Sequence, residues 1–483
     1  MSATTPRPLL AVLLAWSVTT PFSSAAIEPA AAASRPNVLF LFADDMRADS
    51  IAALGNPAVK TPNLDTLVRR GFVLDNAYNL GGNVPAVCTP SRNMLLSGRA
   101  YFRWREHLAP GENPQRRGLL APADAATFPL SLKDAGYLTY HHGKRGNTAT
   151  LIQAQFEINK YLEDDLGDRI DGEPGRRIVD EAIAFLKERS QQKAARPFFM
   201  YLAFGNPHDP RVAAPQYLGL YNRDDIPLPD NYLPAHPFDN GEMTIRDELL
   251  SPWPRTEDEI RRTLHEYYAT ISGLDRHVGR LLQTLNDLRV ADNTIIVFSA
   301  DQGIAVGSHG LLGKQNLYDH STKSPLVFAG PGLRRGRSDA LVYLLDIYPT
   351  VAEMIGVAVP PGIDGVSFKR VLTGQARQAR TELFLAYRHV QRALRDSRWK
   401  LIRYPQVDVT QLFDLRADPH ERRNLAADPD QTTRVNQMMA RMRRWQRELG
   451  DPDPLVVEHP LPAAFTPPTG EELKRLRAQW RMN

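Results

Sequence analysis

The chain has 483 residues, 42% of them hydrophobic, so it can fold as one large α/β domain with a smaller one and is not intrinsically disordered. Its net charge of +4 is spread along the sequence, and no run of Lys and Arg resembles a nucleic-acid-binding arm. The composition therefore predicts a folded protein that has no nucleic-acid partner.

Residues 1–34 are predicted to be a signal peptide followed by a linker. Arg7 supplies a positive n-region, residues 9–16 form the apolar stretch, and residues 23–26 offer a small-residue cleavage site. The apolar stretch is shorter than the about 20 residues that a transmembrane helix needs. No cysteine lies near the cleavage site to carry a lipid. We therefore expect a protein exported to the periplasm or the medium, without a membrane anchor.

The body of the chain alternates strand and helix patterns, which predicts an α/β fold with a large, mostly parallel sheet flanked by helices. Continuous apolar runs, typical of strands buried on both faces, occur at residues 37–43, 198–204, 294–300 and 325–329. One helix is predicted to begin after Thr61 and to end near Gly71. A long helix is predicted to follow Thr256, which forms a capping-box signature with Glu259.

The pattern changes past residue 370. Short β-like segments occur at residues 383–387, 399–404 and 412–415, and a polar helix is predicted near residues 432–449. These predict a small antiparallel sheet with one packed helix, followed by a Pro-rich, charged tail on the surface. The predicted division is a signal peptide and linker (1–34), a large α/β domain that carries the candidate site (35–370), and a C-terminal α+β subdomain with its tail (371–483).

Polar side chains follow three of the predicted strands at their carboxyl ends, where parallel sheets bind ligands. They are Asp44 and Asp45 after the first strand, His208 after the second, and Asp301 and Gln302 after the third. Adjacent carboxylates repel each other unless a cation lies between them, and hard oxygen ligands suit Ca²⁺ or Mg²⁺. The Asp44 and Asp301 clusters together therefore predict a metal site.

Cys88 is the single cysteine of the chain, so it cannot form an internal disulfide, which is unusual for an exported protein. It opens the segment Cys88-Thr89-Pro90-Ser91-Arg92, which is predicted to enter a helix that continues to Gly98. A helix N-terminus presents free N–H groups and the positive end of its dipole to an anion. The segment is therefore well placed to receive an anion beside Cys88.

The same five residues resemble the C-x-P-S-R signature of the type I sulfatases, a family of the alkaline phosphatase superfamily, and Ser97-Gly98-Arg99 stands at that family's usual place downstream. The resemblance extends over roughly residues 36–428 in the family's motif order. Further segments that resemble family motifs are residues 39–46 with Asp44 and Asp45, residues 137–139 with Lys144, residues 198–210 with His208, residues 299–303 with Asp301, and residues 309–318 with Lys314.

In that family a maturation enzyme oxidises the cysteine to formylglycine. The resemblance implies that Cys88 is converted in this way, by a formylglycine-generating or an anaerobic maturation enzyme, and that the hydrate of the aldehyde attacks the sulfur of a sulfate ester. A covalent sulfo-enzyme intermediate would form. Loss of a proton from the second hydroxyl would then release sulfate and restore the aldehyde. A serine or an unmodified cysteine lacks that hydroxyl, so turnover would stall.

The resemblance also implies the metal ligands. The residues expected to hold one ion are Asp44, Asp45, the modified Cys88, Asp301 and Gln302. Ca²⁺ is favoured over Mg²⁺ as that ion. A bound cation lowers the pKa of a coordinated hydroxyl and offsets charge on a sulfate.

The remaining site residues are expected to bind the sulfate ester. Arg92 would stabilise the hydrate and the bound anion. Lys144, His208 and Lys314 would contact the sulfate oxygens and the bridging oxygen and stabilise charge as the S–O bond breaks. His309 is expected to belong to the same pocket and to contact the sulfate or the ester oxygen.

Two positions depart from the family pattern. The family has Gly-Lys-x-His, whereas here Lys144 is followed by Arg145-Gly146, so no histidine stands where the base is expected. The two histidines before the motif are not obvious replacements, and Asn147 offers only a hydrogen-bonding group, so the identity of the base stays open. Gln302 stands where the family commonly has Asn or His, and its carbonyl can still bind Ca²⁺.

Two alternatives to a sulfatase stay open at this point. One is a phosphomonoester or phosphonate hydrolase of the same superfamily, because sulfate and phosphate are both tetrahedral. The other is a degenerate sulfatase that only binds sulfated glycans. Export favours a sulfated carbohydrate as the substrate, with choline sulfate and aryl sulfates as further candidates, and residues 206–211 and 388–392 are expected to offer polar groups to a sugar.

Overall fold

The computed structural model describes residues 1–3, 35–103, 127–144, 146–162, 171–192 and 196–480. The predicted signal peptide and linker fall almost entirely within residues 4–34, which lie outside the described residues. Residues 35–483 form one compact unit. None of the helices in the described ranges is long and apolar enough to cross a membrane.

Within the described residues, a nine-stranded sheet has the order β10-β2-β9-β7-β1-β6-β4-β5, with β8 paired to β2. Its strands are β1 (Asn37–Ala43), β2 (Phe72–Tyr78), β4 (Leu138–Gly143), β5 (Ile158–Tyr161), β6 (Phe198–Ala203), β7 (Thr294–Ala300), β8 (Lys323–Ser324), β9 (Leu326–Ala329) and β10 (Gly336–Tyr343). β7, β1, β6, β4 and β5 are parallel, whereas β9 runs antiparallel to β2 and β7. Every residue of β1, β6 and β7 is buried, as their continuous apolar runs predict. The predicted mostly parallel α/β fold is confirmed.

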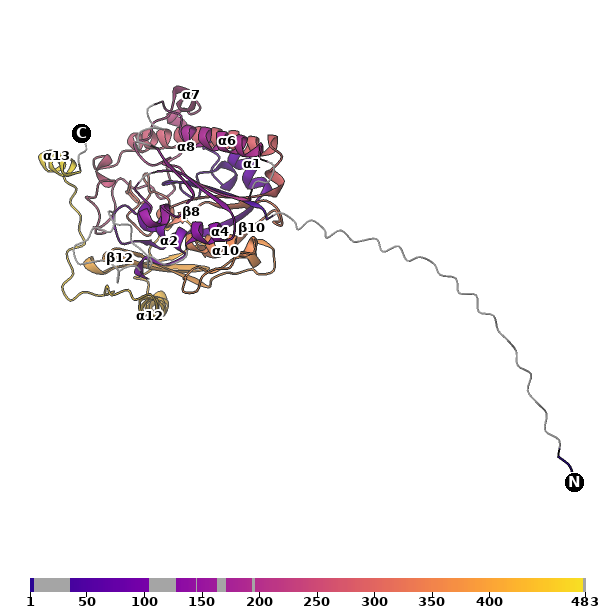
Figure 1. Ribbon diagram of the computed structural model, residues 1–483. Helices are drawn as coiled ribbons and strands as arrows, with labels where there is room; N and C mark the ends of the chain where they lie inside the picture. The colour runs from indigo at the N-terminus through magenta and orange to yellow at the C-terminus, as the bar shows by residue number, and fades with distance from the viewer. Residues whose placement is uncertain (4–34, 104–126, 145, 163–170, 193–195, 481–483) are drawn as a thin grey trace. The chain divides into compact units, whose positions relative to one another are not determined.

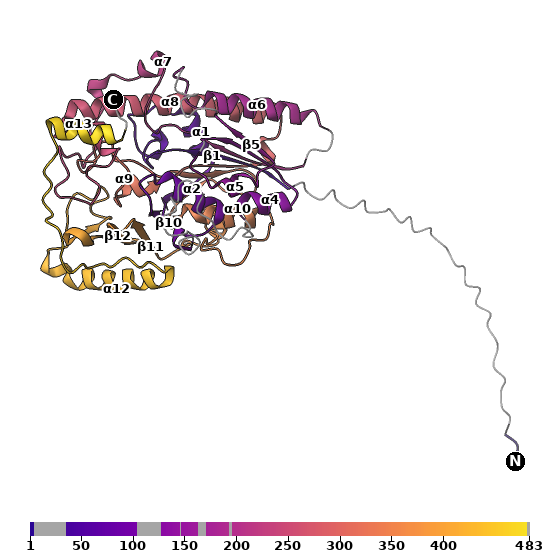
Figure 2. The same ribbon diagram turned by 60° about the vertical axis from the view of Figure 1, so that its left-hand side comes forward.

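Helices cover both faces of this sheet (Figures 1 and 2). One face carries α1 (Pro62–Arg70), α6 (Arg176–Ser190) and α8 (Glu257–Asp287), and the other carries α2 (Cys88–Ser97), α4 (Phe128–Asp134) and α10 (Ile347–Met354). Side chains alternate along β1 and pack against the helices on both faces. Leu39 packs on the face that carries α1, α6 and α8, and Phe40 packs on the face that carries α2, α4 and α10. α8 begins after Thr256, whose Oγ1 accepts a hydrogen bond from Glu259 N at 3.3 Å, so the predicted N-cap is confirmed.

A smaller sheet occupies the C-terminal part of the chain. Its strands are β3 (Gly81–Gly82), β11 (Glu382–Tyr387), β12 (Gln391–Asp396), β13 (Trp399–Tyr404) and β14 (Val409–Asp414). β11 to β14 are antiparallel neighbours, and β3 joins parallel to β11. α12 (Thr432–Leu449) has the predicted bounds and contributes Met438 and Met442 to the core beneath this sheet. The predicted domain boundary at residue 370 stays a prediction.

The sequence patterns do not predict two elements of this region, β12 and α13 (Gly470–Gln479). β12 is buried although it carries Arg392 and Arg395, and Arg392 is matched by Asp451, with Nε and Oδ2 2.6 Å apart. The remaining helices are short: α5 (Thr150–Gln153), α7 (Pro215–Leu218), α9 (Asp319–Thr322) and α11 (Lys369–Leu372), and the 3₁₀ helices η1 (Ala52–Leu54), η3 (Arg223–Asp225), η4 (Glu248–Leu250), η5 (Ala291–Asn293), η6 (Leu344–Asp346), η7 (Pro405–Val407) and η8 (Pro429–Gln431).

Candidate active site

Four neighbouring strands of the large sheet end at one edge, and each is followed by polar side chains. β7, β1, β6 and β4 are adjacent and parallel, so their carboxyl ends meet. Asp301 follows β7, Asp44 and Asp45 follow β1, His208 lies in the segment after β6, and Lys144 follows β4. The strand order therefore brings together residues that are far apart in the sequence.

Three carboxylates, those of Asp44, Asp45 and Asp301, are fully buried at this edge. Ligand atoms of these residues and of Cys88 lie within 4.8 Å of one another, close enough to hold a single ion. The amide of Gln302 belongs to the same cluster: Nε2 donates to Asp45 Oδ1 at 2.6 Å, and Oε1 is buried without a hydrogen-bond partner among the described residues. A set of hard oxygen atoms that includes an unused acceptor fits Ca²⁺ or Mg²⁺ better than a soft metal.

Arg92 joins two of these strand ends from one turn along α2. Its Nη2 donates to Asp44 Oδ2 and its Nε to Asp301 Oδ2, both at 3.0 Å, and the side chain is 1% exposed. Burial alone would lower the pKa of the guanidinium, but Asp301 and Asp44 raise it above its ordinary value. Arg92 therefore stays charged and holds the two carboxylates together.

Two lysines complete the charge balance. Lys144 Nζ lies 2.8 Å from Asp44 Oδ2, and Lys314 Nζ lies 2.7 Å from Asp45 Oδ2. Burial tends to raise the pKa of Asp44, but Lys144 and Arg92 outweigh it and hold that pKa well below its usual range. Three buried carboxylates thus face three buried or nearly buried cations.

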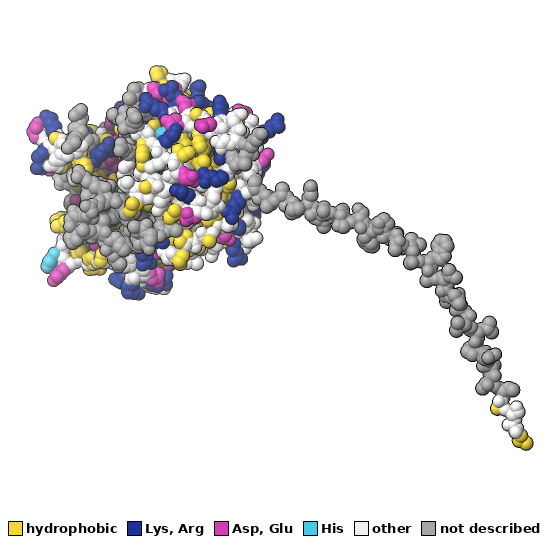
Figure 3. All heavy atoms as spheres, viewed as in Figure 1, with side chains coloured by type: hydrophobic (Ala, Val, Ile, Leu, Met, Phe, Trp, Pro, Cys, Tyr) yellow, Lys and Arg dark blue, Asp and Glu magenta, His cyan; other side chains and the backbone are white. Residues whose placement is uncertain are grey.

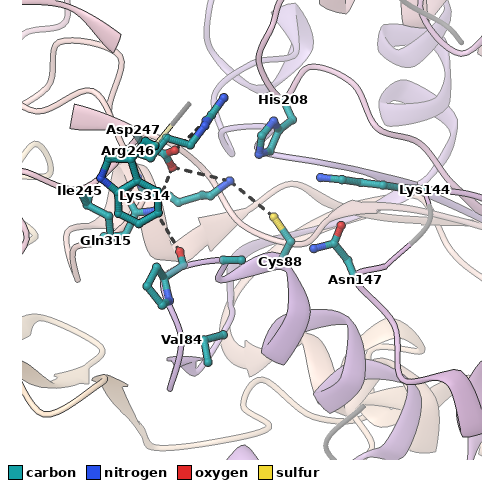
Figure 4. A pocket seen from close by; sticks show the side chains of 13 residues that line it. Val84, Cys88, Lys144, Asn147, His208, Ile245, Arg246, Asp247, Lys314 and Gln315 are labelled. Atoms are coloured by element: carbon teal, nitrogen blue, oxygen red, sulfur yellow. Dashed lines mark hydrogen bonds and ion pairs between the residues drawn. The ribbon is translucent and has the colours of Figure 1, made fainter. Parts of the chain in front are cut away.

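Cys88 is the first residue of α2, and its thiol points toward the ammonium group of Lys314 (Figure 4). The sulfur lies 3.2 Å from Asp44 Oδ1, 3.0 Å from Gln302 Nε2 and 3.5 Å from Lys314 Nζ. Burial, together with the Asp44 carboxylate, raises the pKa of the thiol well above its ordinary value. Because the thiolate is the nucleophilic form, the unmodified side chain is poorly suited to attack at neutral pH.

His208 offers an imidazole to the same space. Its Nδ1 lies 2.6 Å from the carbonyl oxygen of Asp209, which can only accept a hydrogen bond, so we assign the ring proton to Nδ1. Nε2 then faces the cluster, 3.6 Å from Asp45 Oδ2. Burial, with Lys144 and Lys314, lowers the pKa of His208 from its ordinary value, so the ring is neutral and Nε2 is free to accept a proton.

The side chains of Cys88, Lys144, His208 and Lys314 line one pocket of about 440 Å³, which we name the Cys88 pocket (Figure 4). Its lining residues are Val84, Pro85, Ala86, Cys88, Lys144, Asn147, His208, Ile245, Arg246, Asp247, Lys314, Gln315 and Trp480. A thiol at a helix start, an imidazole and two ammonium groups thus meet in one cavity next to the oxygen cluster. Such an arrangement suits the binding of a small tetrahedral anion.

Comparison with known proteins decides the family. A family model described as Sulfatase matches residues 36–357, and a second one, described as N-sulphoglucosamine sulphohydrolase, C-terminal, matches residues 307–448. The chain belongs to the sulfatase family. This confirms the resemblance first seen in the segment from Cys88 to Arg92, and it makes the protein a sulfuric ester hydrolase.

Individual relatives support the same assignment. The sulfatase is 26% identical to the N-acetylglucosamine-6-O-sulfatase of Bacteroides thetaiotaomicron, over 87% of this chain and 88% of the relative. It is 29% identical to the choline-sulfatase of Rhizobium meliloti, over 86% of this chain and 88% of the relative.

Solved structures confirm the fold. One of them, determined in complex with its substrate D-glucosamine-2-N,6-O-disulfate, superposes with a TM-score of 0.71 at 23% identity, over 87% of this chain and 99% of that chain. A phosphonate monoester hydrolase from Silicibacter pomeroyi superposes with a TM-score of 0.72 at 22% identity, over 86% of this chain and 96% of that chain.

The structure brings most of the predicted site residues of this sulfatase together, but not His309. Its Nε2 lies 2.9 Å from the carbonyl oxygen of Glu421, its Nδ1 lies 3.2 Å from His320 Nε2, and its ring stacks on Tyr318 with centroids 3.9 Å apart. Both nitrogens are engaged within the protein, and His309 does not line the Cys88 pocket. The geometry therefore gives this residue no contact with a ligand bound beside Cys88.

The histidine that the family motif places at position 146 has no direct replacement. Gly146 has a φ of 88°, a left-handed conformation that favours glycine, and a Cβ built there would meet nothing within 4 Å. Asn147 lines the Cys88 pocket instead, with Nδ2 donating to Thr89 Oγ1 at 3.2 Å. His141 and His142 are buried on β4 and do not line that pocket. His208 is therefore the imidazole that the described lining residues provide.

Sequence reasoning missed three charged or aromatic lining residues of the sulfatase, namely Arg246, Asp247 and Trp480, and it named Gln315 only as part of a motif. Gln315 Nε2 donates to Asp247 Oδ2 at 2.8 Å, and Asp247 Oδ2 lies 3.9 Å from Lys314 Nζ. Arg246 and Asp247 belong to a long segment between β6 and α8 with little regular structure. No periodic signal marks such residues.

Proposed function

We propose that this protein is an exported, Ca²⁺-dependent sulfatase that hydrolyses a sulfate ester on a sulfated carbohydrate, with formylglycine at position 88 as its reacting group. The observation that carries the proposal is the position of Cys88, at the start of α2 and 3.2 Å from Asp44 in a cluster of buried carboxylates and cations. Burial and the Asp44 carboxylate outweigh Lys314 and Lys144 and raise the pKa of the thiol, whereas an aldehyde hydrate there can use the cation and the charged residues around it.

Charge balance supports a divalent cation and an anionic substrate. The three carboxylates of Asp44, Asp45 and Asp301 are equalled in number by the cations of Arg92, Lys144 and Lys314, with Arg92 shared between Asp44 and Asp301. A divalent ion held by the carboxylates and Gln302 would leave two positive charges in excess. A sulfate ester and a deprotonated hydrate supply two negative charges, so the loaded site would again be close to neutral.

Ca²⁺ is favoured over Mg²⁺ by the number and burial of the oxygen groups. Ca²⁺ accepts six to eight oxygen ligands, including carboxylates and amide carbonyls, whereas Mg²⁺ keeps several waters and uses one or two carboxylates. Here three carboxylates and one carboxamide are fully buried together. When bound, the ion would lower the pKa of a hydroxyl at residue 88 and offset charge on the sulfate.

The chain's own residues would divide the remaining work. One hydroxyl of the residue 88 hydrate attacks sulfur, the S–O bond to the alcohol breaks, and the alcohol leaves with a proton. The second hydroxyl then loses its proton, sulfate departs and the aldehyde returns. Lys144 and Lys314 would hold the sulfate oxygens, and Arg92 would fix the carboxylates beside residue 88. His208 Nε2, which faces the pocket, would take the proton from the attacking hydroxyl and pass it to the leaving alcohol.

The carbohydrate part of the proposal is supported by the relatives and by the pocket. A relative acting on N-acetylglucosamine 6-sulfate and a structure bound to a glucosamine disulfate share this architecture. The pocket lining adds polar groups that suit sugar hydroxyls, including those of Asn147, Arg246, Asp247 and Gln315. Export is supported by the signal-peptide pattern of residues 1–34.

The partners proposed are a sulfated glycan and a maturation enzyme, without nucleic acid or a membrane anchor. Lys and Arg side chains are interspersed with Asp and Glu over the face viewed in Figure 3, which is unlike the single basic patch that nucleic-acid binders carry. The maturation enzyme would be of the formylglycine-generating or the anaerobic type and would act on Cys88.

A substrate screen tests the proposal. The chain is produced together with a maturation enzyme, the peptide that contains residue 88 is weighed, and sulfate release is measured from sulfated mono- and oligosaccharides, choline sulfate and an aryl sulfate. We expect formylglycine at residue 88 and turnover of a sulfated sugar. Cys88→Ser is expected to bind that sugar without sustained turnover. Faster hydrolysis of the matching phosphate ester, or binding without turnover by the modified protein, would contradict the proposal.

A further inference from the structure

The segment after α12 returns to the active site. α12 lies at the bottom and α13 at the upper left in both ribbon views, and residues 450–469 connect them (Figures 1 and 2). This connection is attached to the segment between β6 and α8, since Ala463 O accepts a hydrogen bond from Asp239 N at 2.8 Å. α13 is fixed by Arg477, whose Nε donates to Leu249 O at 2.9 Å. Because Leu249 follows the pocket-lining segment closely in sequence, α13 is held beside the Cys88 pocket.

Trp480, the residue after α13, brings an indole to the rim of that pocket. It lines the Cys88 pocket and also a second pocket of about 670 Å³, which we name the adjoining pocket. Trp480 is 42% exposed, and in the described ranges it is the one aromatic residue among the exposed large hydrophobics. An indole held open to solvent between two pockets offers a flat apolar face to a ligand.

The adjoining pocket is polar and shares Arg246 and Trp480 with the Cys88 pocket. Arg246 Nη1 donates to Asp209 Oδ1 at 3.1 Å and to Asp247 Oδ1 at 2.9 Å, so its guanidinium is held in place between the two. Besides Arg246, the charged side chains that line the adjoining pocket are Asp209, Arg211, Glu259, Arg262 and Glu266. Hydrogen-bond donors and acceptors are thus both present next to an apolar indole.

We propose that Trp480 and Arg246 form a carbohydrate subsite, in which the indole packs against the sugar ring next to the sulfate group and the adjoining pocket takes the neighbouring sugar unit of an oligosaccharide. A sugar ring has an apolar C–H face, which the indole would cover, and a rim of hydroxyls, which can both donate and accept. The side chains around Trp480 supply the matching groups. The proposal deepens the proposed function, on which it rests, by naming an oligosaccharide as the substrate class.

The lining of the adjoining pocket distinguishes a sugar from the small alternative, choline sulfate. A quaternary ammonium group can pack on an indole, but it carries neither a hydrogen-bond donor nor an acceptor. Most charged groups of the adjoining pocket already pair with one another, since Arg246 bonds Asp209, and Arg262 bonds Glu259 and Glu266. Sugar hydroxyls can still donate to these carboxylates and accept from these guanidinium groups, so the structure favours an oligosaccharide.

Steady-state kinetics of Trp480 variants test the subsite. The probes are the sulfated disaccharide that performs best in the screen, its sulfated monosaccharide, choline sulfate, and inorganic sulfate as a competitive inhibitor. For Trp480→Ala, we expect kcat/KM on the disaccharide to fall about fivefold to tenfold, mainly through KM, as for the loss of one aromatic packing surface. Trp480→Phe should retain most of the activity. The inhibition constant of sulfate should not change, because Lys144 and Lys314 are untouched.

The matched control is Leu461→Ala, an exposed apolar residue on the same returning segment that lines neither pocket. It should behave as wild type, and all variants should unfold at the wild-type temperature. The subsite is refuted if Trp480→Ala leaves the disaccharide KM unchanged, weakens sulfate inhibition equally, or affects choline sulfate as strongly as the disaccharide. If the wild type hydrolyses no sulfated sugar, the proposed function fails, and calorimetric binding of the disaccharide to wild type and Trp480→Ala still tests the subsite.

Discussion

Arg92 Nη2 donates a hydrogen bond to Asp44 Oδ2 at 3.0 Å, which ties the second turn of α2 to the end of β1. The Nε of the same guanidinium bonds Asp301 at the end of β7, so one side chain sets the spacing between Cys88 and two strand ends. Arg92 is 1% exposed, and both carboxylates are fully buried. The side chain that neutralises the site therefore also determines its geometry.

Replacing Arg92 by Ala is expected to destabilise the fold by about 3 to 5 kcal/mol, because it removes the guanidinium that pairs with the buried Asp301 and leaves Asp44 with Lys144 alone. Urea denaturation at neutral pH, with and without Ca²⁺, measures the change. The matched control is Arg103→Ala, whose partner Asp364 is 3.2 Å away but whose side chain is 46% exposed. That change should cost less than about 1 kcal/mol. Equal effects of the two substitutions would show that Arg92 does not hold the cluster.

Removal of the divalent cation is expected to lower both the unfolding temperature and the activity. An ion that binds only the folded state stabilises it by about 2.7 kcal/mol at a concentration 100 times its Kd. Differential scanning calorimetry after chelation, and again after adding Ca²⁺ or Mg²⁺, measures this shift. We expect Ca²⁺ to restore the transition more fully than Mg²⁺. Asp301→Asn removes one carboxylate from the cluster of Asp44, Asp45 and Asp301, so the Ca²⁺-dependent rise in unfolding temperature should be largely lost. A full rise in this variant would show that the ion binds elsewhere.

Glu248 is expected to position the segment that carries Lys314. Its Oε1 accepts hydrogen bonds from Gly313 N at 2.8 Å and Leu312 N at 3.1 Å, and its Oε2 accepts one from Arg255 Nη2 at 2.8 Å. Glu248→Gln introduces an N–H donor among these donors, and an unpaired buried donor costs about 1 to 3 kcal/mol. We expect a lower kcat together with a lower unfolding temperature, although Glu248 contacts no substrate.

The comparison for this variant is Glu157→Gln, whose carboxylate bonds Arg196 near the surface and is 26% exposed. It should keep the wild-type kcat. Inhibition by inorganic sulfate reports whether Lys314 keeps its position. This inhibition should weaken in Glu248→Gln, because Lys314 is displaced. Unchanged sulfate inhibition in a destabilised Glu248→Gln would assign Glu248 a purely structural role.

The predictable parts of this protein are those whose pattern is local. β1 and β7 are continuous apolar runs, so their bounds and the carboxylates after them could be read from the sequence. The sequence pattern does not predict β12, because the charged residues Arg392 and Arg395 are unusual in a buried strand. The partner of Arg392 is Asp451, which lies 59 positions away in the sequence. Such long-range pairing leaves no periodic signal.

The difference between local patterns and long-range pairing also explains which parts of the site the sequence predicts. The cluster around Cys88 comes from short segments after strands, where a motif and a fold rule coincide. Arg246 and Trp480 reach the pocket from irregular or distant segments. His309 shows the reverse case: it belongs to a motif-bearing segment, but its backbone has a φ of 54°, and its ring stacks on Tyr318 instead of lining the pocket.

Acidification is expected to destabilise the protein through buried neutral histidines around Tyr318. Burial lowers the pKa of His236 from 6.5 to about 4 and that of His309 to about 3. In the unfolded chain both rings take up a proton near pH 6.5, whereas in the folded protein they do not. Unfolding therefore binds protons, and stability falls as pH drops below 6.5, by about 2 kcal/mol for each histidine between pH 7.5 and 5.0.

Urea denaturation of wild type and His236→Asn at pH 7.5, 6.0 and 5.0 measures this dependence. Asparagine can still donate to the carbonyl oxygen of Phe238, which His236 Nδ1 reaches at 2.7 Å, but it does not titrate. The variant should lose about 2 kcal/mol less than wild type between pH 7.5 and 5.0. His459→Asn, at a side chain that is 90% exposed, should follow the wild-type curve. Parallel curves for wild type and His236→Asn would mean that His236 takes up its proton in the folded state, and that the acid sensitivity of the fold arises elsewhere.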